Sequence, residues 1–225
     1  MAKRESPREN ETRSRQPGIG KTISVSQEKL FGAIKFILGV CLLPFVISSS
    51  AAFLEQLSNI EKGFQGYFWL GVAVFLIFYL FIWEPEVIYS VGRRLLELVF
   101  NFFEPFLRIA PDLLPAYTII LFIVYKLLTI SMKQVWITQY FIFLFGFTTI
   151  LHIVFTAKSI SAKKDFLKGN YIFSFSLIYI VNLLLLGLFF GFIFKEFSFI
   201  SFAGKTFSTA KDAFYNLFSQ IFLNK

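Results

Sequence analysis

The chain has 225 residues, of which 56% are hydrophobic, 20% are aromatic and only 16% are charged. A soluble domain carries about a quarter charged residues, so this composition argues against a soluble globular fold. The net charge of +8 does not indicate a nucleic-acid partner, because the basic residues do not gather on a polar domain. Cys41 is the only cysteine, which excludes an intrachain disulfide and cysteine-rich metal centres.

The first 29 residues are polar and rich in Arg, Glu, Ser and Pro, a composition typical of disorder. No apolar stretch lies within them, so we expect no cleavable signal peptide. We predict that residues 1–29 form a disordered basic tail, 30–195 a helical transmembrane domain, and 196–225 an amphipathic C-terminal helix.

Five long apolar runs occupy most of the chain after residue 29: Phe31–Phe53, Tyr67–Trp83, Leu113–Ile130, Val135–Ala157 and Tyr171–Phe194. Each comes close to the roughly 20 residues that a helix needs to cross the ~30 Å hydrocarbon core of a bilayer. The predicted fold class is therefore all-α, a polytopic membrane protein with about five transmembrane helices, and its first partner is the lipid bilayer.

Two further segments have helical periodicity but carry more charge. In Val87–Ile109, apolar residues recur at steps of three and four. In Phe199–Phe222, a row of Phe, Leu and Ile residues forms one apolar face. We interpret both as amphipathic helices at the membrane interface, the second lying on the membrane surface.

The distribution of basic residues predicts the orientation. Residues 1–29 contain seven basic and four acidic residues, and the short segment 158–168 is also basic. Cytoplasmic segments of membrane proteins carry an excess of Lys and Arg, which predicts a cytoplasmic N-terminus and an exterior C-terminus in a bacterial inner membrane. The segment 84–112 runs against the rule, because its five acidic residues outnumber its three arginines.

Few polar side chains lie inside the apolar runs. Lys126 either pairs with a carboxylate such as Glu97 or extends its amine to the membrane surface. Asn182 is expected to make an interhelical hydrogen bond, and Pro44 predicts a kink in the first helix. His152 is the only histidine; we expect a neighbouring hydroxyl or carbonyl to satisfy it, since a zinc site needs three protein ligands.

The segment Pro85–Leu98 reads PEVIYSVGRRLLEL, and three later stretches begin IAPDLLPAYT at Ile109, GFTTILHIVFT at Gly146 and GNYIFS at Gly169. In order and spacing these stretches, which cover roughly 67–190, resemble a bacterial family of multi-spanning proteins similar to site-2-protease-type zinc metallopeptidases. In that family a proline and a tyrosine lead into a glycine, which is followed by His-Glu-Leu-Thr-His.

The resemblance implies that the metal site is lost. In the family motif two histidines grip zinc and the glutamate activates the bound water. Here Arg93 and Arg94 occupy the first histidine and glutamate positions, and Glu97 the second histidine position. A guanidinium offers a metal no lone pair, so we expect no catalytic residue and no cofactor. Arg93 and Glu97 are then placed to form an i,i+4 ion pair. Alternatively, the three residues are only the polar face of an interfacial helix. His152 and Asp165 match polar family positions and are weak metal candidates.

The leading functional hypothesis is therefore a catalytically inactive, metallopeptidase-like membrane protein that binds a transmembrane helix or another membrane protein. Two alternatives stay open. One is a small transport or channel component with Pro44, Lys126 and Asn182 along its path, and the other is an architectural subunit of a membrane complex. An active enzyme is the least favoured reading, because the cluster of charged residues from Glu84 to Glu97 contains no nucleophile and no histidine.

Overall fold

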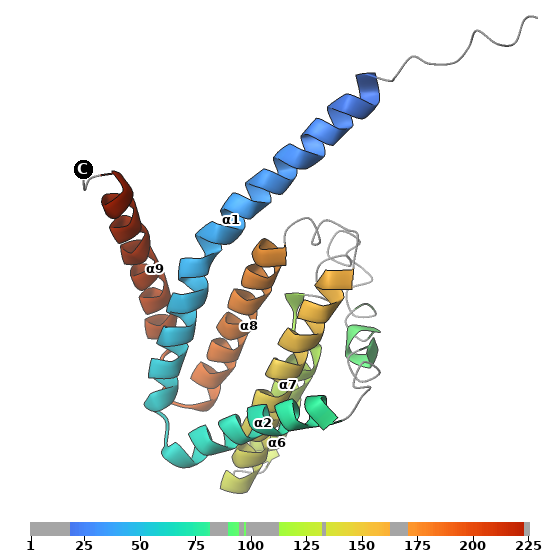
Figure 1. Ribbon diagram of the computed structural model, residues 1–225. Coiled ribbons are helices and arrows are strands. Elements are labelled where there is room, and N and C mark those ends of the chain that lie inside the picture. The colour runs from blue at the N-terminus through green and yellow to red at the C-terminus, as the bar shows by residue number, and fades with distance from the viewer. Residues whose placement is uncertain are drawn as a thin grey trace, which may run out of the picture.

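The computed structural model describes residues 19–81, 90–94, 97, 113–131, 134–162 and 171–222. Regular structure in these residues is helical throughout, which confirms the all-α class (Figure 1). The main helices of the described residues are α1 (Ile19–Ser58), α2 (Lys62–Phe81), α6 (Ala116–Ser131), α7 (Val135–Ala162), α8 (Tyr171–Ile193) and α9 (Phe199–Phe222).

Each predicted apolar run corresponds to one of these helices. Four stretches are long and apolar enough to cross a bilayer: Leu30–Ser58, Lys62–Phe81, Val135–Ser161 and Tyr171–Ile193. The fifth run forms α6, whose 16 residues span about 24 Å at 1.5 Å per residue. Helices suit such sequences because they satisfy their backbone polar groups internally, without water.

The first helix is longer than the sequence pattern predicted. Residues 19–29, which we assigned to the disordered tail, form the beginning of α1. Between residues 21 and 58 the sequence has few strong helix breakers, and extending an existing helix costs much less than nucleating one. The helix also continues through Pro44. The nearby Ser49 and Ser50 hydroxyls both donate to the Val46 carbonyl, at 3.0 and 2.7 Å.

Contacts between helices fix the relative directions of two pairs. Gly39 of α1 meets Phe173 of α8, and further along Ser50 meets Tyr179, so α1 and α8 run parallel. In contrast, α6 is antiparallel to α7, since Thr118 meets Thr148 while Tyr125 meets Thr138. Helix α2 departs from this arrangement, since it lies across α1 and α8 in Figure 1 rather than along them.

The closest helix contact joins α2 and α7. A Cβ atom added to Gly71 would overlap the Phe143 carbonyl oxygen, and one added to Gly146 would overlap the Phe68 carbonyl oxygen. The two backbones therefore touch at a pair of glycines, as small residues allow in membrane helix packing.

Phenylalanine fills the core around this contact. Phe53 lies within 6.1 Å, between ring centroids, of aromatic rings on α2, α8, the α8–α9 connection and α9. The rings concerned are Phe68, Phe190, Phe197 and Phe202. Tilted and edge-on ring pairs of this kind add stability beyond the area that they bury.

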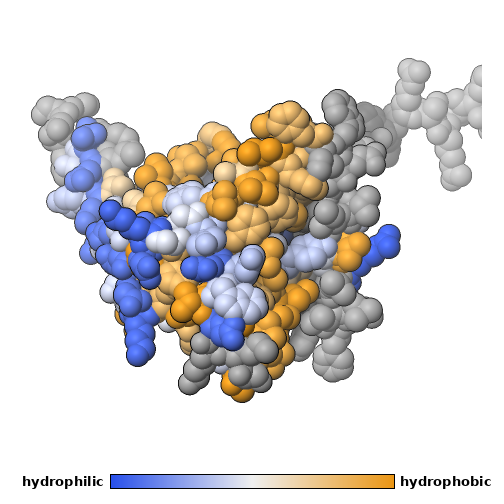
Figure 2. All heavy atoms as spheres, turned by 90° about the horizontal axis from the view of Figure 1, so that it is seen from below, coloured by the Kyte–Doolittle hydropathy of each residue, from blue (hydrophilic) through white to orange (hydrophobic). Residues whose placement is uncertain are grey.

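Helix α9 is amphipathic, as predicted. Its buried residues Phe202, Thr206 and Ala210 recur every four residues, and its other face is hydrophilic over part of the surface in Figure 2. The structure adds that α9 packs antiparallel to α1: the Ser198 N–H donates to Gln56, while Phe214 contacts Phe45 at 6.0 Å between ring centroids.

Candidate functional site

Arg93 and Glu97 bind each other through their side chains. The Arg93 Nε donates to the Glu97 carboxylate at 3.0 Å, one helical turn away. Arg94 is exposed. Because neither arginine can ligate a metal and the one carboxylate is already paired, these residues do not fit a catalytic zinc. Asp165 lies outside the described residues, and no three His, Cys, Asp or Glu side chains of the described part come together in a metal-binding group.

The glycine beside this pair has a packing role. Gly92 is buried, and a Cβ atom there would lie 2.5 Å from a ring carbon of Tyr117, at the beginning of α6. The short helical segment 90–94 therefore sits directly on α6. The absence of a side chain at Gly92 permits this close approach.

His152 lies within α7 and is 5% exposed. Its Nε2 is 3.4 Å from the Thr156 hydroxyl, one turn along the same helix. Other hydroxyls close by are also bonded within the bundle: Thr118 meets Thr148 at 3.0 Å, and Thr148 also donates to the Leu144 carbonyl at 2.9 Å. These contacts give α6 and α7 a polar seam, which suits a structural role.

Lys126 does not pair with Glu97, whose carboxylate accepts from Arg93. Its amine donates to the Phe192 carbonyl at 2.9 Å and lies over the rings of Phe122 and Phe192 at 5.6 and 5.7 Å from their centroids. Phe192 is in the last turn of α8, where carbonyls lack helical partners and the helix dipole is negative. The lysine thus caps α8 from the neighbouring α6.

Asn182 is fully buried. Its amide nitrogen donates to the Ile178 carbonyl at 2.8 Å and to the Leu113 carbonyl, just before α6, at 3.2 Å. The second bond ties α8 to the chain that enters α6. Such interhelical bonds contribute about 0.6 kcal/mol on average to the stability of membrane proteins, so the role of Asn182 is a modest stabilisation of the helix packing.

The structure therefore brings together only one pair of the predicted site residues, Arg93 and Glu97. Lys126, His152 and Asn182 each bond to a different partner and share no site. The feature that residue-by-residue reading missed is a cavity of about 200 Å³ between four helices. Its wall is lined by Ser50, Phe53, Leu54, Phe68, Trp69, Val72, Gly146, Thr149, Ile150, Ile153, Tyr179, Leu183 and Leu186.

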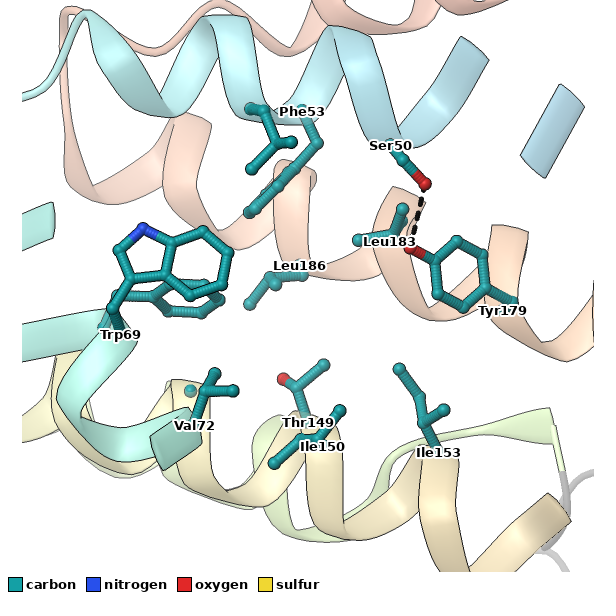
Figure 3. Close-up of a pocket in the computed structure, with 13 residues that line it drawn as sticks. Ser50, Phe53, Trp69, Val72, Thr149, Ile150, Ile153, Tyr179, Leu183 and Leu186 are labelled. Carbon is teal, nitrogen blue, oxygen red and sulfur yellow. Dashed lines mark hydrogen bonds between the residues drawn. The ribbon is translucent and has the colours of Figure 1, made fainter. Parts of the chain in front are cut away.

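Figure 3 shows how the cavity is built. Residues of α1 and α8 form one wall, and residues of α2 and α7 form the other. The described residues of the wall are apolar apart from three hydroxyls and the indole N–H of Trp69. Ser50 and Tyr179 lie 2.8 Å apart at one end, and Thr149 lies on the opposite wall. The sequence carries one clue to this wedge-shaped space, the glycines Gly71 and Gly146 at which α2 and α7 touch.

Comparison with known proteins adds no family to this description. The chain matches no family model, no curated protein and no solved structure.

Proposed function

We propose that the chain is a non-catalytic integral membrane protein that binds a transmembrane helix of a partner along its first helix. The proposal includes a bacterial inner-membrane location with the N-terminus in the cytoplasm, as the distribution of basic residues favours. It also includes the metallopeptidase-like ancestry, with an ion pair in place of the metal.

The motif positions support the non-catalytic part. Metal-assisted hydrolysis needs a ligand set that leaves an open position for water. Arg93 brings a fixed positive charge instead, and its guanidinium forms an ion pair with the Glu97 carboxylate. An i,i+4 pair of this kind stabilises a helix by a few tenths of a kcal/mol, so its contribution here is structural.

The single observation that carries the proposal is the exposure of residues 30–38 of α1, which we call the leading segment. Three consecutive residues, Phe36, Ile37 and Leu38, are 53, 61 and 46% exposed. Consecutive helical residues lie about 100° apart, so large apolar side chains of this segment are exposed on most of its circumference. In the most apolar stretch of α1 only 6% of the residues are buried, against 50% in α7.

Site-specific photo-crosslinking in native membranes tests this partner. A photoreactive amino acid at Ile37 is expected to give a discrete protein adduct. The matched control is Leu80 on α2, which is apolar and 76% exposed and is expected to label lipid alone. An adduct of about twice the 26.0 kDa of this chain identifies a second copy as the partner, and any other discrete mass identifies a different protein.

Two results count against the proposal. If Ile37 labels only lipid, as Leu80 does, the leading segment has no protein partner. Metal analysis of the purified protein tests the non-catalytic part, and stoichiometric zinc in the unmodified chain contradicts it. The variant that carries Arg93→His, Arg94→Glu and Glu97→His is the positive control for a rebuilt motif.

A further inference from the structure

The cavity between the helices has the size and walls of a site for a small molecule. Helices α1 and α2 diverge from the turn that joins them (Figure 1), and the wedge between them leaves a space of about 200 Å³. An apolar cavity of about 150 Å³ in another protein is large enough for benzene. This cavity therefore has room for a six-membered ring with one or two small substituents.

The walls favour a flat ring. Phe53, Phe68, Trp69 and Tyr179 contribute four aromatic side chains to the lining. Aromatic rings attract one another in offset and edge-on arrangements, by about 0.5–1.5 kcal/mol beyond the area that they bury. Among the described residues, no Asp, Glu, Lys or Arg lines the cavity, so a charged molecule would lose its hydration without compensation from them.

One hydroxyl in the wall lacks a partner. Thr149 is 6% exposed and its Oγ1 makes no hydrogen bond. Three helical threonines elsewhere donate to the carbonyl four residues back: Thr129 to Tyr125, Thr148 to Leu144 and Thr206 to Phe202. Thr149 does not, and in Figure 3 its hydroxyl points into the cavity.

The other two hydroxyls already use their hydrogens. Ser50 donates to the Val46 carbonyl at 2.7 Å, because a carbonyl can only accept. The hydrogen in the 2.8 Å contact between Ser50 and Tyr179 therefore belongs to Tyr179. Among the three hydroxyls, Thr149 is thus the one whose hydrogen is available to a ligand; the wall's other donor is the indole N–H of Trp69. A water molecule is a poor occupant, because a buried water needs two to four polar partners.

We propose that this cavity binds a neutral, membrane-soluble molecule with a six-membered ring and a carbonyl oxygen. The ring packs among the four aromatic side chains, and the carbonyl accepts the hydrogen bond of Thr149. A purely hydrocarbon ligand gains nothing from that hydroxyl, whereas a carbonyl oxygen supplies the acceptor that it lacks. This inference is independent of the helix partner proposed for α1, because residues 30–38 do not line the cavity.

Two fluorinated probes of matched shape test the proposal by ¹⁹F NMR on the full chain in lipid nanodiscs. The probe 4′-fluoroacetophenone carries the carbonyl, and 1-ethyl-4-fluorobenzene replaces it with a methylene group. We expect saturable binding of the ketone beyond its partition into empty nanodiscs. Thr149→Val keeps the shape of the side chain and removes its hydroxyl, and it is expected to weaken ketone binding about fivefold and leave the hydrocarbon probe unchanged.

A second pair of variants tests the location. Leu54 lines the cavity and is 48% exposed, so Leu54→Trp fills the space without disturbing the buried core and is expected to abolish binding of both probes. Ile47→Trp changes a 70% exposed residue of the same helix outside the lining and is expected to have no effect. The proposal is overturned if ketone binding does not saturate, if it survives Leu54→Trp, or if Thr149→Val leaves it unchanged.

Discussion

Helix α2 and the leading segment of α1 have similar apolar compositions, yet one is locked into the bundle and the other stands apart from it. The backbone of α2 touches that of α7 at Gly71, where a Cβ atom would overlap the Phe143 carbonyl. Gly32 in the leading segment has nothing within 4 Å of the corresponding position. Apolar sequence thus makes a helix suitable for lipid, but small residues in the right place decide whether it meets another helix.

The largest expected effect comes from filling the tight contact. Gly71→Leu forces a side chain into the α7 backbone, which cannot yield as a side-chain end would. We expect loss of the folded bundle, seen as aggregation in gel filtration and as loss of resistance to proteolysis. Gly32→Leu is the matched change in the leading segment and should leave both properties unaltered. If Gly71→Leu stays monodisperse and protease-resistant, as Gly32→Leu is expected to, the backbones of α2 and α7 do not approach as closely as described.

A smaller effect is expected from phenylalanine deletions in the same two regions. Phe75 of α2 is completely buried and packs against Phe147 with 5.3 Å between ring centroids. Phe75→Ala should lower the free energy of unfolding by about 3–5 kcal/mol. Phe36→Ala in the leading segment removes a 53% exposed ring and should cost less than about 1 kcal/mol in detergent.

Unfolding by SDS titration of detergent-solubilised protein measures both values. A large loss for Phe36→Ala in the isolated chain would mean that the leading segment packs on this bundle and is not available to a partner.

The positions of most helices were readable from the sequence, because bilayer thickness fixes helix length. Val135 and Tyr171 were predicted as the first residues of two runs, and α7 and α8 begin there. The beginning of α1 at Ile19 was missed, since its polar first turns carry no apolar periodicity. The pairing of helices was also not predictable, because a phenylalanine-rich face suits lipid and protein equally well.

The candidate sites also include one feature that the sequence predicts and others that it does not. The Arg93–Glu97 pair was predictable because helical geometry places residues i and i+4 together. The partner of Lys126 was not, because Phe192 lies 66 residues away and offers a backbone carbonyl, which any residue carries. The cavity depends on how α1 and α2 diverge, so its lining residues share no local pattern.

The smallest expected effect concerns the packed end of α1. Glu55, near the end of α1, pairs with Lys205 of α9, and both side chains are about half exposed, at 49 and 48%. Exposed pairs of this kind contribute about 0.2–1 kcal/mol. A double-mutant cycle with Glu55→Gln and Lys205→Met should therefore give a coupling below about 1 kcal/mol, reduced further by salt. A coupling of several kcal/mol would place the ion pair among the main links between α1 and α9. A coupling below about 1 kcal/mol would mean that apolar contacts, such as Phe45 against Phe207 and Phe214, hold α1 and α9 together. The leading segment of α1 lacks comparable contacts with the described bundle.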